Sequence, residues 1–146
     1  MSDPVDKEIV DAVARLRLVV RALNRRAQAE TGPGSPTRTE QAVLAWLDDR
    51  GVLTASVLAS LEQIRPQSMA QTIDAVERRG WVERSADPDD RRQALITLTE
   101  AGRIALDRGR RLRQAWILEA IRTRLDAQEQ HALIAAIGLL ERMVFD

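Results

Sequence analysis

Arginines and aspartates stand beside turn-forming residues in one short segment, ADPDDRR, at residues 86–92. Its proline and aspartates are typical of a tight turn, and the flanking segments Trp81–Arg84 and Gln93–Leu98 alternate as short β-strands do. We therefore predict a two-stranded hairpin with Arg91 and Arg92 near its tip. Guanidinium groups suit binding to phosphates and base edges. The alternative is a charged turn that only meets solvent.

Polar side chains share one face of the helix that is predicted before this hairpin, and Met69, Ile73 and Val76 recur at helical spacing and form its apolar stripe. The helix should begin at Pro66, because proline is favoured in the first helical turn, and end before Gly80, which suits a left-handed C-terminal position. The N-terminal turn of such a helix can enter the DNA major groove, where all four base pairs are distinguishable. The alternative is a polar face that only meets solvent. The candidate residues are Arg65, Gln67, Ser68, Gln71 and Thr72.

A further candidate site lies at the start of another predicted helix, at Thr37, Arg38 and Thr39. Hydroxyl groups, a guanidinium and the backbone N–H groups of a helix N-terminus can all contact phosphates. Thr39 and Glu40 are predicted to cap this helix.

The residues that most enzymes and metal sites need are missing from the chain. It has no cysteine and one histidine, His131, and it contains neither a glycine-rich phosphate loop nor HExxH. The acidic pairs Asp48–Asp49 and Asp89–Asp90 fall at a helix end and in a turn. We expect no enzyme activity, no cofactor and no metal. With no apolar run of about 18 residues and no signal-peptide pattern, we expect no membrane association and a cytoplasmic location.

The charge of the chain does not favour DNA binding, because 22 basic residues balance 22 acidic ones. A basic domain would be the usual indication of a nucleic-acid partner. Lys7 is the only lysine, and the excess of arginine suits phosphate binding, although GC-rich coding would explain it equally well. Composition alone decides nothing.

Helical patterns fill most of the remaining chain. Residues 5–30 carry an apolar stripe over several turns and end at a glycine- and proline-rich segment, Thr31–Thr37. Two short helices follow. The first runs from Thr39 and Glu40 to about Arg50, and the second runs from Ala55 to about Gln63 and is capped by Thr54. After the hairpin, a long helix should run to about Arg124, and Asp126–Glu129 has the capping-box spacing that opens a last helix.

This order predicts a mostly α fold with a small β-hairpin wing. We expect one chain, 1–146, in which a winged helix-turn-helix at 37–99 is flanked by long helices at 5–30 and 100–146. The long helices exceed what a winged helix needs to fold, and an economical explanation is that they form a dimerisation region.

The run VERRGWVERSADPDDRRQALITLTEAGR, from Val76 to Arg103, resembles the MarR family of bacterial transcription regulators. It is similar to the family's leucine-glutamate-basic-basic-glycine-leucine-valine, Asp-Pro-x-Asp-Arg-Arg and leucine-threonine-glutamate-x-glycine patterns. Thr39-Glu40-Gln41 with Leu44, and Val57-Leu58-Ala59, match weaker family positions. Trp81 departs from the usual leucine. The resemblance covers essentially the whole chain, and the run at the wing is its specific part.

The resemblance implies a homodimer that binds an inverted repeat in a promoter, most often as a repressor. By analogy, Arg92 would enter the minor groove, Asp90 would brace it, and Arg91 would lie near phosphate. A small aromatic or anionic effector would bind between the dimerisation helices and the DNA-binding region, with Leu16, Trp46 and Trp116 as candidate pocket residues. The alternative is a winged helix that contacts only other proteins.

Overall fold

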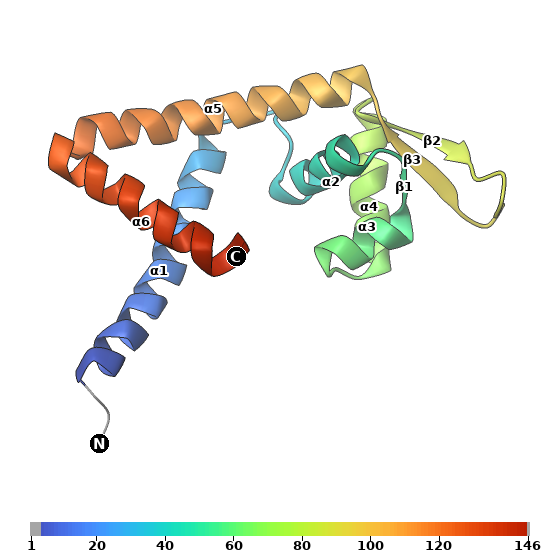
Figure 1. The fold of residues 1–146 in the computed structure, drawn as a ribbon. Coiled ribbons are helices and arrows are strands. Elements are labelled where there is room, and N and C mark those ends of the chain that lie inside the picture. Colours follow the sequence, from blue (N-terminus) through green and yellow to red (C-terminus); the bar gives the residue numbers. More distant parts are fainter. Residues whose placement is uncertain (1–3, 146) are drawn as a thin grey trace. The chain divides into compact units, whose positions relative to one another are not determined.

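The computed structural model describes residues 4–145, with side chains from Asp6 onward (Figure 1). Val5, the first position of the predicted stripe, therefore lies outside the described side chains. The fold is mostly helical with one small antiparallel sheet, which confirms the predicted fold class. The elements are α1 (Pro4–Ala29), α2 (Arg38–Arg50), β1 (Leu53–Thr54), α3 (Ala55–Glu62), α4 (Pro66–Arg78), β2 (Val82–Ala86), β3 (Ala94–Leu98), α5 (Glu100–Arg124) and α6 (Ala127–Phe145).

The chain divides into two compact units. We call Thr31–Arg111 the core unit, and the described residues of Met1–Glu30 and Leu112–Asp146 the helical unit. The division falls inside α5, whereas the sequence placed the boundary between residues 99 and 100. Within residues 4–145, no helix combines the length and apolar character that crossing a bilayer requires.

The sheet of the core unit has three strands in the order β1-β3-β2. The sequence predicted only a hairpin, and β1 was missed because two residues are too few to show an alternating pattern. Its residue Leu53 lies opposite Ile96 of β3. The hairpin strands begin and end within two residues of their predicted limits, and they pair from Val82 opposite Leu98 to Ala86 opposite Ala94.

The interior of the core unit is filled by α2, α3, α4 and the sheet, which lie close together in Figure 1. Met69, Ile73 and Val76 of α4 are fully shielded from solvent, as their helical spacing predicted. They pack with Leu44 of α2 and Leu58 of α3 in one apolar cluster. Full burial of each such side chain contributes about 1.5–3 kcal/mol, so α4 is held firmly by its apolar face and presents its polar face outward.

Most helix starts follow the predicted capping chemistry. The Thr54 hydroxyl accepts the N–H of Val57, and Asp126 and Glu129 form the reciprocal bonds of a capping box. The start of α2 differs from the prediction: Thr37, not Thr39, is the N-cap. The Thr37 hydroxyl accepts the Glu40 N–H at 3.3 Å, and the Glu40 carboxylate accepts the Thr37 N–H at 3.1 Å. Thr37 forms both bonds because Glu40 stands at the required third position.

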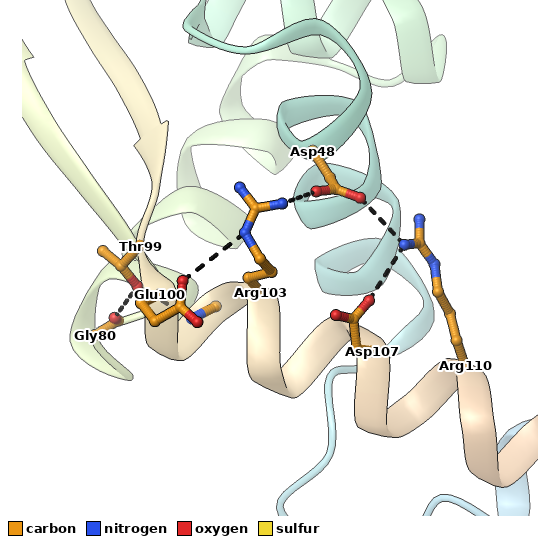
Figure 2. Close-up of polar contacts among 8 residues, drawn as sticks. Asp48, Gly80, Thr99, Glu100, Arg103, Asp107 and Arg110 are labelled. Atoms are coloured by element: carbon orange, nitrogen blue, oxygen red, sulfur yellow. Dashed lines mark hydrogen bonds and ion pairs between the residues drawn. The ribbon is translucent and has the colours of Figure 1, made fainter.

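The start of α5 is fastened to the rest of the core unit (Figure 2). The Thr99 hydroxyl donates to the carbonyl of Gly80 at 2.6 Å. Asp48 of α2 accepts hydrogen bonds from both Arg103 and Arg110, the latter at 3.1 Å. At Gly102 an added Cβ would lie 2.1 Å from the carbonyl oxygen of Trp81. Glycine is therefore required for α5 to begin this close to the backbone that follows α4.

The helical unit exposes much of its apolar surface. On α1, the predicted stripe is solvent-exposed at Ile9, Val13 and Val20, and on α6 no described residue is buried. Arg26 of α1 lies 5.8 Å from the ring centroid of Trp116. The predicted dimerisation role of these helices remains a prediction.

Candidate nucleic-acid interface

The N-terminal half of α4 carries the predicted base-reading residues. Pro66 opens the helix, and Arg65 before it makes no side-chain cap. Gln67, Ser68 and Gln71 are exposed. Thr72 is half-buried and its hydroxyl donates to the Ser68 carbonyl at 3.1 Å. The helix thus presents short polar groups to solvent while its opposite face is fixed in the core.

A groove separates this face from the start of α2. Its volume is about 400 Å³. The structure brings predicted residues from both helices to this groove, although they are some thirty positions apart in the sequence. Its lining consists of Thr37, Thr39, Glu40, Ile64, Ser68, Gln71, Thr72 and Ala75. Arg38 and Arg65 are exposed on the same two helix starts.

The hairpin tip holds Asp90 and Arg92 together. A carboxylate oxygen of Asp90 accepts the backbone N–H of Arg92 at 3.0 Å and its Nε–H at 3.3 Å. The Arg92 side chain is 92% exposed. Because Asp90 contacts only the Nε side of the guanidinium, the two Nη groups remain directed to solvent. Arg91 beside it is also exposed.

Many carboxylates of the core unit form ion pairs with arginines that are not candidate site residues, so its balanced charge does not mean that the interface itself is neutral. Several carboxylates are paired with arginines: Asp48 with Arg103 and Arg110, Glu40 with Arg79, and Asp74 and Glu77 with Arg84. By contrast, the structure shows no carboxylate within ion-pair distance of the candidate residues Arg38, Arg65 and Arg91, counting only residues that it describes. The cations at the candidate interface are therefore less neutralised than the composition implies.

The structural contact made by Arg84 was not predicted from the sequence. Its guanidinium contacts Asp74 and, at 2.8 Å, Glu77, so it joins β2 of the hairpin to α4. The sequence offered only a weak signal, an arginine in a predicted strand ten residues beyond an aspartate, and it was counted only toward the charge balance.

The three predicted pocket residues lie in both units. Trp46 belongs to the core unit, where its Nε1–H donates to Glu62 at 2.6 Å and Arg50 lies 4.9 Å from its ring centroid. Leu16 and Trp116 belong to the helical unit. Their role in effector binding stays a prediction. In the described part of the chain, no group of three or more histidine or acidic side chains is placed to hold a metal ion.

Comparison with known proteins identifies the class of this fold. A putative transcriptional regulator from Pseudomonas aeruginosa has a solved structure with a TM-score of 0.81 at 31% identity, covering 93% of this chain and 96% of that one. A MarR family protein from Bacillus stearothermophilus has a TM-score of 0.77 at 19% identity, over 97% and 98% of the two chains. The core unit is thus a winged helix-turn-helix of the kind found in transcription regulators.

The family follows from the sequence comparisons. Residues 37–94 match the MarR family model. An uncharacterized HTH-type transcriptional regulator from Mycobacterium bovis is 33% identical over 141 residues, 93% of this chain and 97% of the relative. A relative of the same description from Mycobacterium leprae is 31% identical over the same shares. The chain belongs to the MarR family, as its sequence predicted, and this is a family of transcriptional regulators rather than enzymes.

Proposed function

We propose that this chain is a sequence-specific DNA-binding repressor that binds an inverted repeat in a promoter as a homodimer. The observation that carries the proposal is the groove between the starts of α2 and α4, which is lined mostly by polar residues and flanked by Arg38 and Arg65, both unpaired among the described residues. A solved MarR mutant from E. coli, 22% identical over 99% of this chain with a TM-score of 0.68, is complexed with operator DNA. DNA as partner would place this chain in the cytoplasm.

The start of α4 is the proposed base-reading element. Gln67, Ser68 and Gln71 have side chains of a length that reaches base edges in the major groove, and Arg65 is placed for phosphate. Thr37, Arg38 and Thr39 would contact the phosphate backbone on the other side of the groove. Thr72 takes part less freely, because its hydroxyl proton is used within α4.

The hairpin is the proposed minor-groove element. A narrow minor groove concentrates negative potential and attracts arginine. Asp90 holds the backbone and Nε of Arg92, so the guanidinium is oriented before it meets DNA and loses less conformational freedom on binding. Arg91 would contact phosphate beside it.

The helical unit is the proposed dimerisation region. Its exposed apolar side chains on α1 and α6 exceed the scattered apolar residues that a monomer surface usually carries. A two-fold dimer would present two α4 helices to one face of DNA, with half-sites about 34–36 Å apart. A small aromatic or anionic effector would alter that separation and release DNA.

The proposal is tested by measuring binding to DNA that flanks the chain's own gene. We expect salt-sensitive binding to an inverted repeat, because phosphate contacts release counterions. Arg92→Ala should weaken binding about 10- to 100-fold, or about 1–3 kcal/mol, with helix content and self-association unchanged. Arg108→Ala, at an exposed arginine outside the site, is the control. Unchanged binding by Arg92→Ala would remove the wing from the interface, and no binding by the wild type at low salt would favour a protein-contact module.

A further inference from the structure

Arg79, the C-cap residue that follows α4, reaches three other parts of the core unit. Its Nη1 donates to the carboxylate of Glu40 at 2.8 Å and to the carbonyl of Ser35 at 3.4 Å, and its Nη2 donates to the carbonyl of Gly34 at 3.1 Å. The guanidinium carbon lies 4.1 Å from the ring centroid of Trp81. The planar guanidinium of Arg79 therefore donates hydrogen bonds along its edge and stacks with its face on the indole of Trp81.

The Glu40 carboxylate serves two partners. The oxygen that receives Arg79 also accepts the backbone N–H of Thr37, which closes the capping box of α2. Only 12% of the Glu40 side chain is exposed. The end of α4 is therefore tied, through a single carboxylate, to the first residue of the α2 start.

We propose that Arg79 is a positioning residue for DNA recognition, which fixes the phosphate-binding start of α2 at a set distance from the base-reading face of α4. The inference rests on the proposed function, because it assigns both helix starts to one DNA site. Arg79 itself does not line the groove between them. It maintains the width of the groove that Thr37 and Thr39 share with Ser68 and Gln71.

Lysine cannot replace arginine in this role. Donating to a carboxylate and two carbonyls while stacking on an indole requires a planar group with several fixed donors, and an ammonium is a compact point charge. Trp81 supplies the stacking face. The same residue's carbonyl accepts the N–H of Thr99 at 3.0 Å, so the cluster around Arg79 also fixes the point from which α5 begins.

The test compares Arg79→Lys with Arg78→Lys, a neighbouring exposed arginine for which the structure shows no ion pair among the residues it describes. We expect Arg79→Lys to weaken binding to the inverted repeat about tenfold and Arg78→Lys to leave it unchanged. The dependence of affinity on salt should keep its slope in Arg79→Lys, because no phosphate contact is removed, whereas Arg38→Ala should lower that slope by about one.

A binding cycle separates positioning from general stability. In a chain that already carries Arg38→Ala and Thr39→Ala, two of the three side-chain contacts that Arg79 positions are absent, and Arg79→Lys should then cost no more than about twofold. An undiminished tenfold loss in that background would overturn the inference, as would wild-type affinity of Arg79→Lys alone or an equal loss from Arg78→Lys.

A second variant covers the case in which Arg79→Lys fails to fold. Glu40→Gln keeps an oxygen for the Thr37 N–H but removes the charge that holds Arg79, and it should weaken binding about three- to fivefold with the same dependence on the Arg38→Ala, Thr39→Ala background. If the wild type binds DNA but Glu40→Gln binds equally well, only this inference fails. If the wild type binds no DNA, the proposed function fails with it.

Discussion

The core unit and the helical unit differ in the solvent exposure of their apolar side chains. Among the described residues, every large side chain that is fully buried belongs to the core unit, between Val43 and Leu106. In the helical unit, Ile134, Met143 and Phe145 of α6 are all strongly exposed, Phe145 at 81%. The first unit is stabilised by burial within one chain. The second keeps apolar surface in water, which is the arrangement expected of helices that complete their burial against a second copy.

The largest loss of stability is expected from substituting Gly102, a glycine of the core unit that has no room for a side chain. In Gly102→Ala the added Cβ would meet the carbonyl oxygen of Trp81 and the side chain of Leu98, and backbone cannot move aside cheaply. We expect the free energy of unfolding to fall by about 3 kcal/mol, measured by urea denaturation.

Gly138→Ala is the matched control in the helical unit. A Cβ at Gly138 meets no atom within 4 Å, and alanine is favoured over glycine inside a helix by about 0.5–1 kcal/mol, so this variant should be as stable as the wild type or slightly more so. Equal stability of Gly102→Ala and the wild type would contradict the close approach of α5 to Trp81.

An intermediate effect is expected on self-association. Ile137 of α6 is 45% exposed, and Ile137→Glu would place a carboxylate where the proposed dimer buries apolar surface. We expect self-association to weaken at least about tenfold, or about 1.4 kcal/mol, in sedimentation equilibrium. Val52→Glu introduces the same charge at an exposed apolar residue of the core unit and should leave self-association intact. If both variants associate like the wild type, α6 is not the dimer interface.

The smallest effect is expected at the ion pairs between α2 and α5 (Figure 2). Asp48→Asn removes the charge that Arg103 and Arg110 share. Both arginine side chains are about half exposed, so solvent screens the pairs and the loss should be about 0.5–1 kcal/mol. Because salt screens such pairs further, the difference between variant and wild type should shrink in 1 M NaCl. A difference that stays constant with salt would mean that Asp48 acts by packing rather than by charge.

Local signals predicted the parts of the fold that depend on neighbours in sequence. The stripe of α4, the proline at its start, the left-handed Gly80 and the capping box at Asp126 follow from short-range rules, and each is present. The cap of α2 was placed two residues late, although Thr37 and Glu40 have the capping-box spacing that identifies the true cap.

Contacts between distant residues could not be predicted in this way. Arg79 and Glu40 are 39 positions apart, and their pairing depends on how α2 packs on α4. The contact of Arg84 with α4 was equally unpredictable, because it depends on how the hairpin formed by β2 and β3 packs against that helix. The candidate site residues could be named from one sequence, but the groove between the starts of α2 and α4 and the residues that hold it in place required the three-dimensional structure.

We propose that the core unit binds DNA and that the helical unit pairs two copies of the chain. The most direct test of this division is the stoichiometry of the complex with DNA. Sedimentation velocity with a labelled inverted repeat should give two chains per duplex. A duplex with one half-site should bind on the order of 100-fold more weakly, because the second contact is no longer linked to the first. One chain per inverted repeat, or equal affinity for the single half-site, would contradict the proposal that two linked copies bind the DNA together.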